Sequence, residues 1–329
     1  MNPDLIRERA RIVSAIRRFF DDAGFVEVET PVRIAAPAPE EHIDCPVVLG
    51  TTYRGGISPN PSEGGGVSYL RASPELQMKK LLAAGMDKIY QIGPCFREGE
   101  RGSRHNPEFT MIEWYRREAD YRDIMEDLKR LFASLAQVQS SSFKHLHVRD
   151  AYREYAGWDP WVGAWDQDRF DFDMATKIEP AIKSLGGGVF LMDYPPQAAS
   201  LAKLSRAAPT TNHQAPGTKH QAPGTKHQAP STKHQAPGTS YAERWEFYWD
   251  GMELANCFTE LCDGPEQARR FALAKAARKQ LNESDYPIDD EFLAVLPMIK
   301  RAAGVALGVD RLVMVLTGAK EISAVRAQD

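Results

Sequence analysis

The sequence predicts an α+β fold in which helices flank an antiparallel sheet. Segments with strand and helix patterns are mixed along the chain without the regular strand–helix–strand spacing of a parallel sheet. Neither common nucleotide-binding loop occurs, because no GxGxxG follows a strand and no GxxxxGK[ST] is present. With 329 residues, 43% hydrophobic and 26% charged, the composition is that of a globular protein with a substantial core.

The helices are expected from capping residues and apolar periodicity. Asn2, Pro3 and Asp4 form a helix start, with a capping side chain, a proline at the first helical position and an acid in the first turn. Apolar residues then recur at helical spacing until Gly24. Further helices are expected over residues 73–82, 120–138 and 267–281, and residues 304–315 are expected to form a glycine-rich turn that runs into an apolar helix.

Strands are expected where β-branched and aromatic residues cluster. The segment 25–31 is a short strand stopped by Pro31, and residues 109–115 alternate loosely as a strand with one buried face. Two more strands are expected over residues 188–194 and 246–249. We expect residues 1–329 to form a single domain.

One segment differs from the rest of the chain, because residues 207–240 repeat the unit HQAPGTK. A coiled coil is excluded, since every unit contains proline and little apolar mass. The four histidines spaced by seven residues also suggest a metal site, but an extended proline-rich segment would hold the imidazoles far apart. We therefore expect a disordered surface insertion that interrupts the domain at about 207–240.

Charge and cysteine content exclude several classes of protein. The net charge of −4 gives no overall electrostatic footprint for nucleic acid. Four cysteines without a CxxC pair fit a reduced protein with buried thiols. No apolar signal core opens the sequence and no apolar run of 18 residues occurs, so a cytoplasmic protein without membrane contact is expected.

Two chemical requirements meet in the segment 96–115. Arg97 and Arg104 can hold a polyphosphate, because the guanidinium forms bidentate, charge-assisted hydrogen bonds and stays charged. Glu113 and Tyr115 can hold a small cation. Taken alone, the segment is equally consistent with a charged hairpin that carries ordinary surface ion pairs.

Two later blocks extend this chemistry. Glu246, Glu253 and Glu260 recur at intervals of seven, and Arg311 lies just inside a helix behind two glycines. Carboxylates beside phosphate-binding arginines make sense when Mg²⁺ is present, since this ion takes one or two carboxylates together with substrate phosphates. The alternative for the acidic block alone is a surface strand with solvated acids.

The blocks together resemble the signature motifs of class II aminoacyl-tRNA synthetases. The segments RHNPEFTMIEWY, ELANCFTE and GVALGVDRL are similar almost letter for letter to the lysine-specific branch. The resemblance covers nearly the whole chain apart from the insertion. It implies a six-stranded antiparallel sheet, a homodimer formed through motif 1, and ATP bound on the sheet with Mg²⁺.

Two features resemble the elongation factor P–lysine ligase family, a truncated paralogue of lysyl-tRNA synthetase. The first helix begins at residue 2 or 3, so the anticodon-binding barrel is expected to be missing, and Ala306 stands where the synthetases usually have glycine. The resemblance implies activation of (R)-β-lysine or lysine and transfer to a lysine of elongation factor P, without stable tRNA binding. The alternatives are a minimal synthetase that charges tRNA or another acceptor, and a silent paralogue that senses lysine or ATP.

The resemblance also implies roles for individual residues. Arg97 would hold the α-phosphate and Arg311 the γ-phosphate, as the catalytic pair, while Glu246 and Glu253 would hold Mg²⁺. The remaining expected ATP contacts are Glu98, Gly99, Glu100, Asn106, Phe247 and Gly308. The family's usual Phe-Arg-x-Glu is altered here by a glycine, so whether Glu98, Glu100 or the backbone contacts adenine stays open.

The expected substrate contacts divide into two ends. Ser73, Pro74 and Glu75 would bind the amino group at the reacting end. Glu113, Tyr115 and Glu260 would bind the ε-ammonium, with Glu253 and Ala306 completing the pocket. A surface patch with Arg116, Arg117 and Arg122 is expected to receive a protein acceptor.

Overall fold

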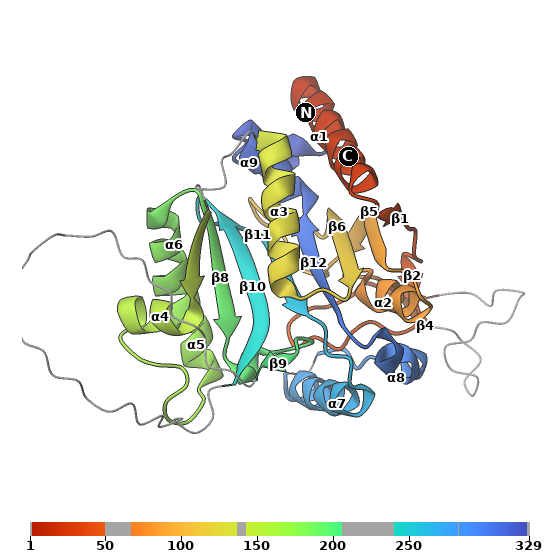
Figure 1. Ribbon diagram of the computed structural model, residues 1–329, viewed down its shortest axis with the longest axis vertical. Coiled ribbons are helices and arrows are strands. Elements are labelled where there is room, and N and C mark those ends of the chain that lie inside the picture. The colour runs from red at the N-terminus through yellow and green to blue at the C-terminus, as the bar shows by residue number, and fades with distance from the viewer. Residues whose placement is uncertain (1, 50–66, 137–142, 206–239, 282, 328–329) are drawn as a thin grey trace, which may run out of the picture.

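The computed structural model describes residues 2–49, 67–136, 143–205, 240–281 and 283–327 (Figure 1). Within these ranges the main sheet has nine strands in the order β1-β5-β6-β12-β11-β10-β8-β7, with β9 on β10. Their bounds are β1 (Val26–Glu27), β5 (Lys88–Phe96), β6 (Glu108–Arg117), β7 (Phe143–His147), β8 (Gly188–Tyr194), β9 (Leu204–Ser205), β10 (Tyr241–Trp249), β11 (Met252–Thr259) and β12 (Ala302–Gly308). In sheet order, the six strands β5, β6, β12, β11, β10 and β8 each pair antiparallel with their neighbours, as expected. Strands β1 and β7 add parallel pairs at the two ends.

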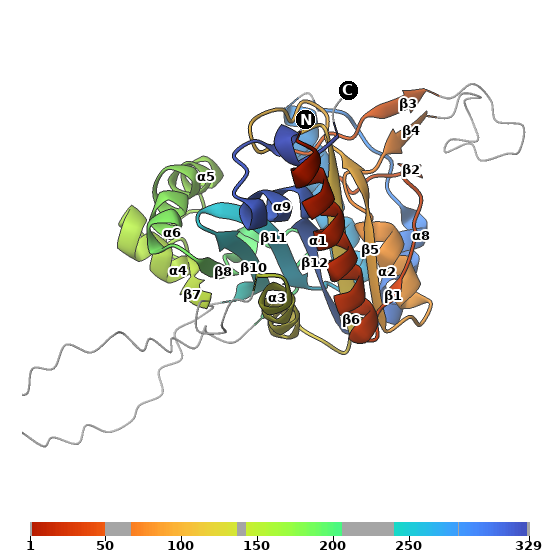
Figure 2. The same ribbon diagram turned by 90° about the horizontal axis from the view of Figure 1, so that it is seen from above.

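Three helices cover one face of this sheet: α1 (Pro3–Asp22), α3 (Tyr121–Ala136) and α9 (Val309–Thr317). Figure 1 shows α3 lying across the strands, and Figure 2 shows α1 and α9 in the same layer. Phe20 packs at ring-centroid distances of 4.9 Å from Tyr90 and 5.1 Å from Trp114. The largest apolar cluster therefore lies between these helices and the sheet.

The opposite face is covered only at its two ends. At the β5–β6 end lie α2 (Glu75–Ala83), α7 (Gly264–Gln280), α8 (Asp290–Val295) and η5 (Leu296–Ile299). At the β8–β10 end lie α4 (Val148–Ala151), η2 (Tyr152–Ala156), α5 (Gln167–Asp173), η3 (Met174–Ile178) and α6 (Glu179–Leu185). The short elements η4 (Pro196–Ala198) and η6 (Ile322–Val325), and a small sheet of β2 (Arg33–Ile34), β4 (Val67–Leu70) and β3 (Val47–Leu49), complete the fold.

Most expected helix boundaries are confirmed. The Asp4 N–H donates to the Asn2 side chain at 3.0 Å, and Pro3 begins α1. The expected glycine-rich turn at 304–308 is wrong, because these residues form β12 in the middle of the sheet. Strand β12 pairs with β6 on one side and β11 on the other, so hydrogen bonding across two partners overrides the weak strand preference of glycine.

Several expectations concern residues outside the described ranges. All but Ser240 of the HQAPGTK insertion lies there, as do its four histidines. Within the described ranges, no group of three or more His, Cys, Asp or Glu side chains is placed to hold a metal ion. The helices of the described chain are all too short or too polar to span a membrane.

Candidate active site

A cavity of about 470 Å³ opens on the face of the sheet that the helices leave uncovered. This volume is in the range of small-molecule sites. Most of the residues expected at the site line it: Ser73, Glu75, Arg97, Glu100, Asn106, Glu113, Tyr115, Glu246, Glu253, Ala306, Gly308 and Arg311. The structure thus brings together side chains from four strands and two helices that are far apart in sequence.

Phe247, which is expected to contact ATP, has its side chain on the face of the sheet opposite to the cavity. Neighbouring side chains of a strand point to opposite faces, so Glu246 faces the cavity while Phe247 faces the helices. Phe247 is fully buried, with its ring 5.0 Å from that of Phe132 and 4.7 Å from that of Phe190. It is a core residue.

The turn after β5 places the two acids of the altered motif differently. Glu98 and Gly99 are exposed and do not line the cavity, and the Glu98 N–H donates to the Asp44 carbonyl at 2.8 Å. Glu100 does line it and lies 3.4 Å from Arg97. Of the two acids in this turn, Glu100 is the one positioned to contact a ligand.

Four arginines line the cavity, Arg97, Arg104, Arg244 and Arg311, and give it positive charge. Arg311 lies in the first turn of α9, where Nη1 donates to the Glu253 carbonyl at 3.0 Å and Nη2 donates to His105 Nε2 at 2.6 Å. Burial and the charge of Arg311 lower the pKa of His105, so the imidazole is held neutral and can accept this bond. Arg97 lies over the ring of Phe109 at 5.2 Å.

A pair of carboxylates lies beside these arginines. Glu246 accepts hydrogen bonds from Arg244 at 2.6 Å and from the Tyr248 hydroxyl at 2.7 Å. Burial, followed by the charge of Glu246, raises the pKa of Glu253 to about 7. A carboxylate held in this way attracts a cation, so the pair fits Mg²⁺, whose remaining ligands would be phosphate oxygens and water.

The other end of the cavity is acidic and buried. Glu113 accepts hydrogen bonds from the Ser73 hydroxyl at 2.6 Å and the Tyr115 hydroxyl at 2.7 Å. Burial, together with the charge of Glu75, raises the pKa of Glu113 to about 7. Glu260 lies behind the cavity lining, and its Oε1 atom is buried without a hydrogen-bond partner. An orphaned carboxylate oxygen of this kind fits an ammonium group.

Pro74 does not line the cavity. Its carbonyl accepts the Met78 N–H at 3.0 Å in the first turn of α2. The Glu75 N–H donates to Ser73 Oγ at 3.0 Å, which fixes the start of the same helix. Pro74 therefore orients Ser73 and Glu75 rather than contacting a ligand in the cavity.

Sequence reasoning missed three residues of the site. Phe109 lines the cavity because it shares a face of β6 with Met111 and Glu113, a period-two pattern that is visible in the sequence. Arg244 lies two residues before Glu246 and reaches the same face by the same rule. Lys79 lies four residues after Glu75, the spacing of an acid–base pair on a helix.

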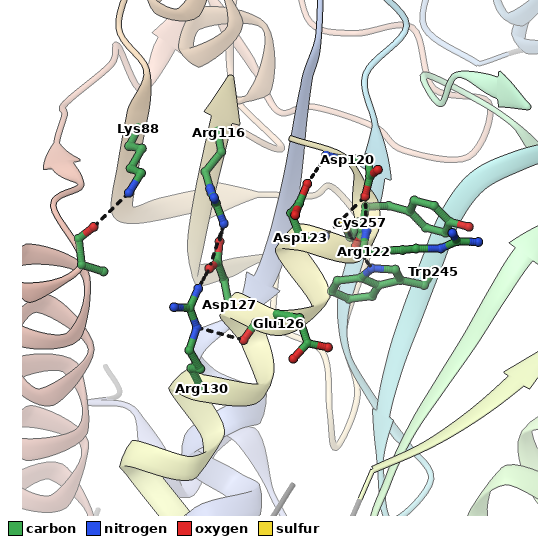
Figure 3. Close-up of polar contacts among 12 residues, drawn as sticks. Lys88, Arg116, Asp120, Arg122, Asp123, Glu126, Asp127, Arg130, Trp245 and Cys257 are labelled. Atoms are coloured by element: carbon green, nitrogen blue, oxygen red, sulfur yellow. Dashed lines mark hydrogen bonds and ion pairs between the residues drawn. The ribbon is translucent and has the colours of Figure 1, made fainter. Parts of the chain in front are cut away.

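The arginines expected to form an acceptor patch do not line the cavity. Arg116 follows Tyr115 on β6 and therefore points to the opposite face. Figure 3 shows it joined to Asp127 of α3, with its Nη1 atom 3.0 and 3.1 Å from the two carboxylate oxygens. Arg117 lies 3.7 Å from Asp87, and Arg122 lies over the Tyr121 ring. These arginines make local contacts away from the site.

Comparison with known proteins agrees with this geometry. Residues 2–327 match the family described as tRNA synthetases class II (D, K and N). The chain is 36% identical to the elongation factor P–(R)-β-lysine ligase of Proteus mirabilis over 342 residues, which covers 97% of this chain and 93% of that protein. The ligases of Histophilus somni strain 2336 (33% identity, 96% and 92% covered) and Pasteurella multocida (36% identity, 97% and 93% covered) are similar. The chain belongs to the class II tRNA synthetase family, on the branch that contains these ligases.

Proposed function

We propose that this protein activates (R)-β-lysine, or lysine, with ATP and transfers the acyl group to a lysine side chain of elongation factor P. Similar proteins at 33–36% identity carry the name of this ligase. The observation that carries the proposal is one cavity with arginines, among them Arg97 and Arg311, at one end and a buried acidic cluster at the other. Gly308 and Gly304 mark these ends on β12, so they are separated by roughly 13 Å along the strand.

The arginine end would bind ATP. Arg97 would hold the α-phosphate and Arg311 the γ-phosphate, because both residues line the cavity and a guanidinium binds phosphate through charge-assisted hydrogen bonds. Glu246 and Glu253 would hold Mg²⁺, which would neutralise phosphate charge when bound. Asn106 and Gly308 line the same end and would contact the nucleotide.

The acidic end would bind the amino acid. Ser73 and Glu75 would bind the amino group near the reacting carboxylate, while Glu113, Tyr115 and Glu260 would bind the distal ammonium. Ala306 pairs with Glu113 across β12 and β6, so its methyl group lies close to this end and would shape the pocket.

The chemistry would then need positioning rather than a nucleophilic side chain. A carboxylate oxygen of the substrate attacks the α-phosphorus, the bond to the bridging oxygen breaks, and pyrophosphate leaves. Arg97 would stabilise the charge that develops at the α-phosphate, and Arg311 would hold the departing pyrophosphate. In the second step, the amine of the acceptor lysine attacks the acyl carbon and AMP leaves.

The proposed acceptor is a protein in the cytoplasm, served by a homodimer. The net charge of −4 supports this choice, because stable tRNA binding needs many cationic contacts to phosphates. Purified enzyme should place radiolabelled β-lysine on elongation factor P, and not on bulk tRNA, when both are offered with ATP. Label that is lost on ribonuclease treatment and persists without the factor would show a tRNA-charging enzyme instead. Absence of ATP–pyrophosphate exchange with every lysine isomer would refute the enzymatic proposal.

A further inference from the structure

Lys79 is a buried cation of the protein that lies behind the acidic end of the cavity, where it contacts the lining residue Glu75. Its side chain is 2% exposed and projects from α2 toward β11. The Nζ atom is 2.5 Å from Glu75 Oε1 and 2.5 Å from Glu260 Oε2, and it lies 5.0 Å above the Phe258 ring. One internal ammonium therefore joins two carboxylates, whose facing oxygens lie at most about 5 Å apart.

The charges in this cluster do not balance without a ligand. When Glu75, Glu113 and Glu260 are all ionised, the single ammonium of Lys79 leaves two of their three negative charges unmatched. Burial also raises the pKa of the neighbouring Glu40, Cys95, Tyr115, Cys257 and Cys262, which disfavours their charged forms. A ligand with two ammonium groups would complete the balance.

We propose that Lys79 is a specificity-determining residue. It ties Glu75 to Glu260, and it reduces the negative charge of the ionised pocket from three to two, which matches the two ammonium groups of a diamino acid. This inference rests on the proposed function, since it assumes that the substrate amines occupy the acidic end. The bridge joins the residues assigned to the two amino groups of the substrate. Lys79 therefore fixes the distance between the two amine subsites as well as their total charge.

The pKa shifts around Lys79 give the proposal a measurable consequence. Burial raises the pKa of Glu260 to about 8, and the charge of Lys79 is the main influence that lowers it. Burial also raises the pKa of Glu113 to about 7. An ammonium binds the ionised carboxylate, so affinity for the substrate should rise with pH through these values. Without Lys79, the carboxylates should ionise only at higher pH.

The test compares Lys79→Met with Lys80→Met. Lys80 is the adjacent residue on α2, but it pairs with Asp289 and Glu291 and does not line the cavity, so it controls for loss of a lysine from the helix. In the pH profile of kcat/KM for lysine in pyrophosphate exchange, the acid limb is the fall in kcat/KM toward low pH. We expect the midpoint of this limb to move up by about one pH unit in Lys79→Met. This shift corresponds to roughly 10-fold lower activity near pH 7. An acid limb that coincides with that of Lys80→Met would overturn the proposal.

The double variant Lys79→Met/Glu260→Gln separates charge from folding. It removes one cation and one anion together, so the pocket again carries two unmatched negative charges. The acid limb should return toward the wild-type position, even though kcat/KM stays low because a substrate contact is lost. A limb that stays at the position of the single variant would show that Lys79 acts only through packing.

Calorimetry on the wild-type protein tests the same charge count without a variant. Lysine has two ammonium groups and norleucine has one, so lysine should release more protons on binding, measured in buffers of different ionisation enthalpy. Equal release by the two ligands would contradict the proposal. Wild-type protein that binds and activates neither would refute the proposed function instead.

Discussion

Gly304 lies where β12 passes under the ring of Tyr115, and it has no room for a side chain. A Cβ atom at this position would overlap the Tyr115 ring and would lie 3.0 Å from Glu260 Oε1. Tyr115 cannot move freely, because its ring is buried and its hydroxyl donates to Glu113 at 2.7 Å. Overpacking at such a position costs about 1–3 kcal/mol.

Gly304→Ala should therefore lower the melting temperature by roughly 2–12 °C, at about 2–4 °C for each kcal/mol in a large domain. The displaced ring should also weaken lysine binding more than ATP binding, so KM for lysine should rise at least about 10-fold while KM for ATP changes little. Thermal denaturation followed by circular dichroism, together with exchange kinetics, measures both effects.

Gly308→Ala on the same strand is the matched control. A Cβ atom there meets only the Arg311 side chain, at an ordinary distance of 3.9 Å, so folding stability should stay within about 0.5 kcal/mol of the wild type. If Gly308 borders the nucleotide, this variant should weaken ATP binding instead. A Gly304→Ala protein that melts with the wild type and binds lysine normally would refute the packing of Tyr115 described above.

Two further changes test the assigned roles. Arg97→Ala should reduce pyrophosphate exchange on the order of 100-fold or more, because a preorganised charge stabiliser is lost. Arg101→Ala is the control, since Arg101 is exposed and does not line the cavity. Equal activity of the two variants would show that Arg97 has no part in the mechanism. Ala306→Gly should move preference from (R)-β-lysine toward α-lysine, measured as the ratio of kcat/KM values for the two isomers, and an unchanged ratio would show that this methyl group does not select the substrate.

Local sequence signals predicted the elements that depend on local contacts. The cap at Asn2 and the apolar periodicity of α3 gave these helices within a few residues of their observed bounds. The segment 304–308 was assigned incorrectly because its strand conformation depends on β6 and β11, which are distant in sequence. Strand pairing of this kind leaves little trace in a glycine-rich segment.

The site shows the same division between local and distant information. Motif residues such as Arg97 and Glu253 stand in recognisable blocks and line the cavity, whereas the side chain of Phe247, an expected ATP contact, faces the core. A strict period-two pattern anchored at Glu246 would have excluded it. Lys79 escaped notice because its importance comes from Glu260, which is 181 residues away and meets it only in the folded protein.

The acids with raised pKa values mark where burial outweighs the charge of the cations that the protein itself supplies. Burial raises the pKa of Glu253 and Glu113 to about 7 and that of Glu260 to about 8. These three are the residues to which we assign external cations, a metal ion for Glu253 and the distal ammonium for the other two. Each raised pKa means that the free protein holds protons where the bound ligands would place positive charge. On the proposed function, ligand binding at this site would exchange protons for cations, and the internal cation Lys79 would set how many are exchanged at the acidic end.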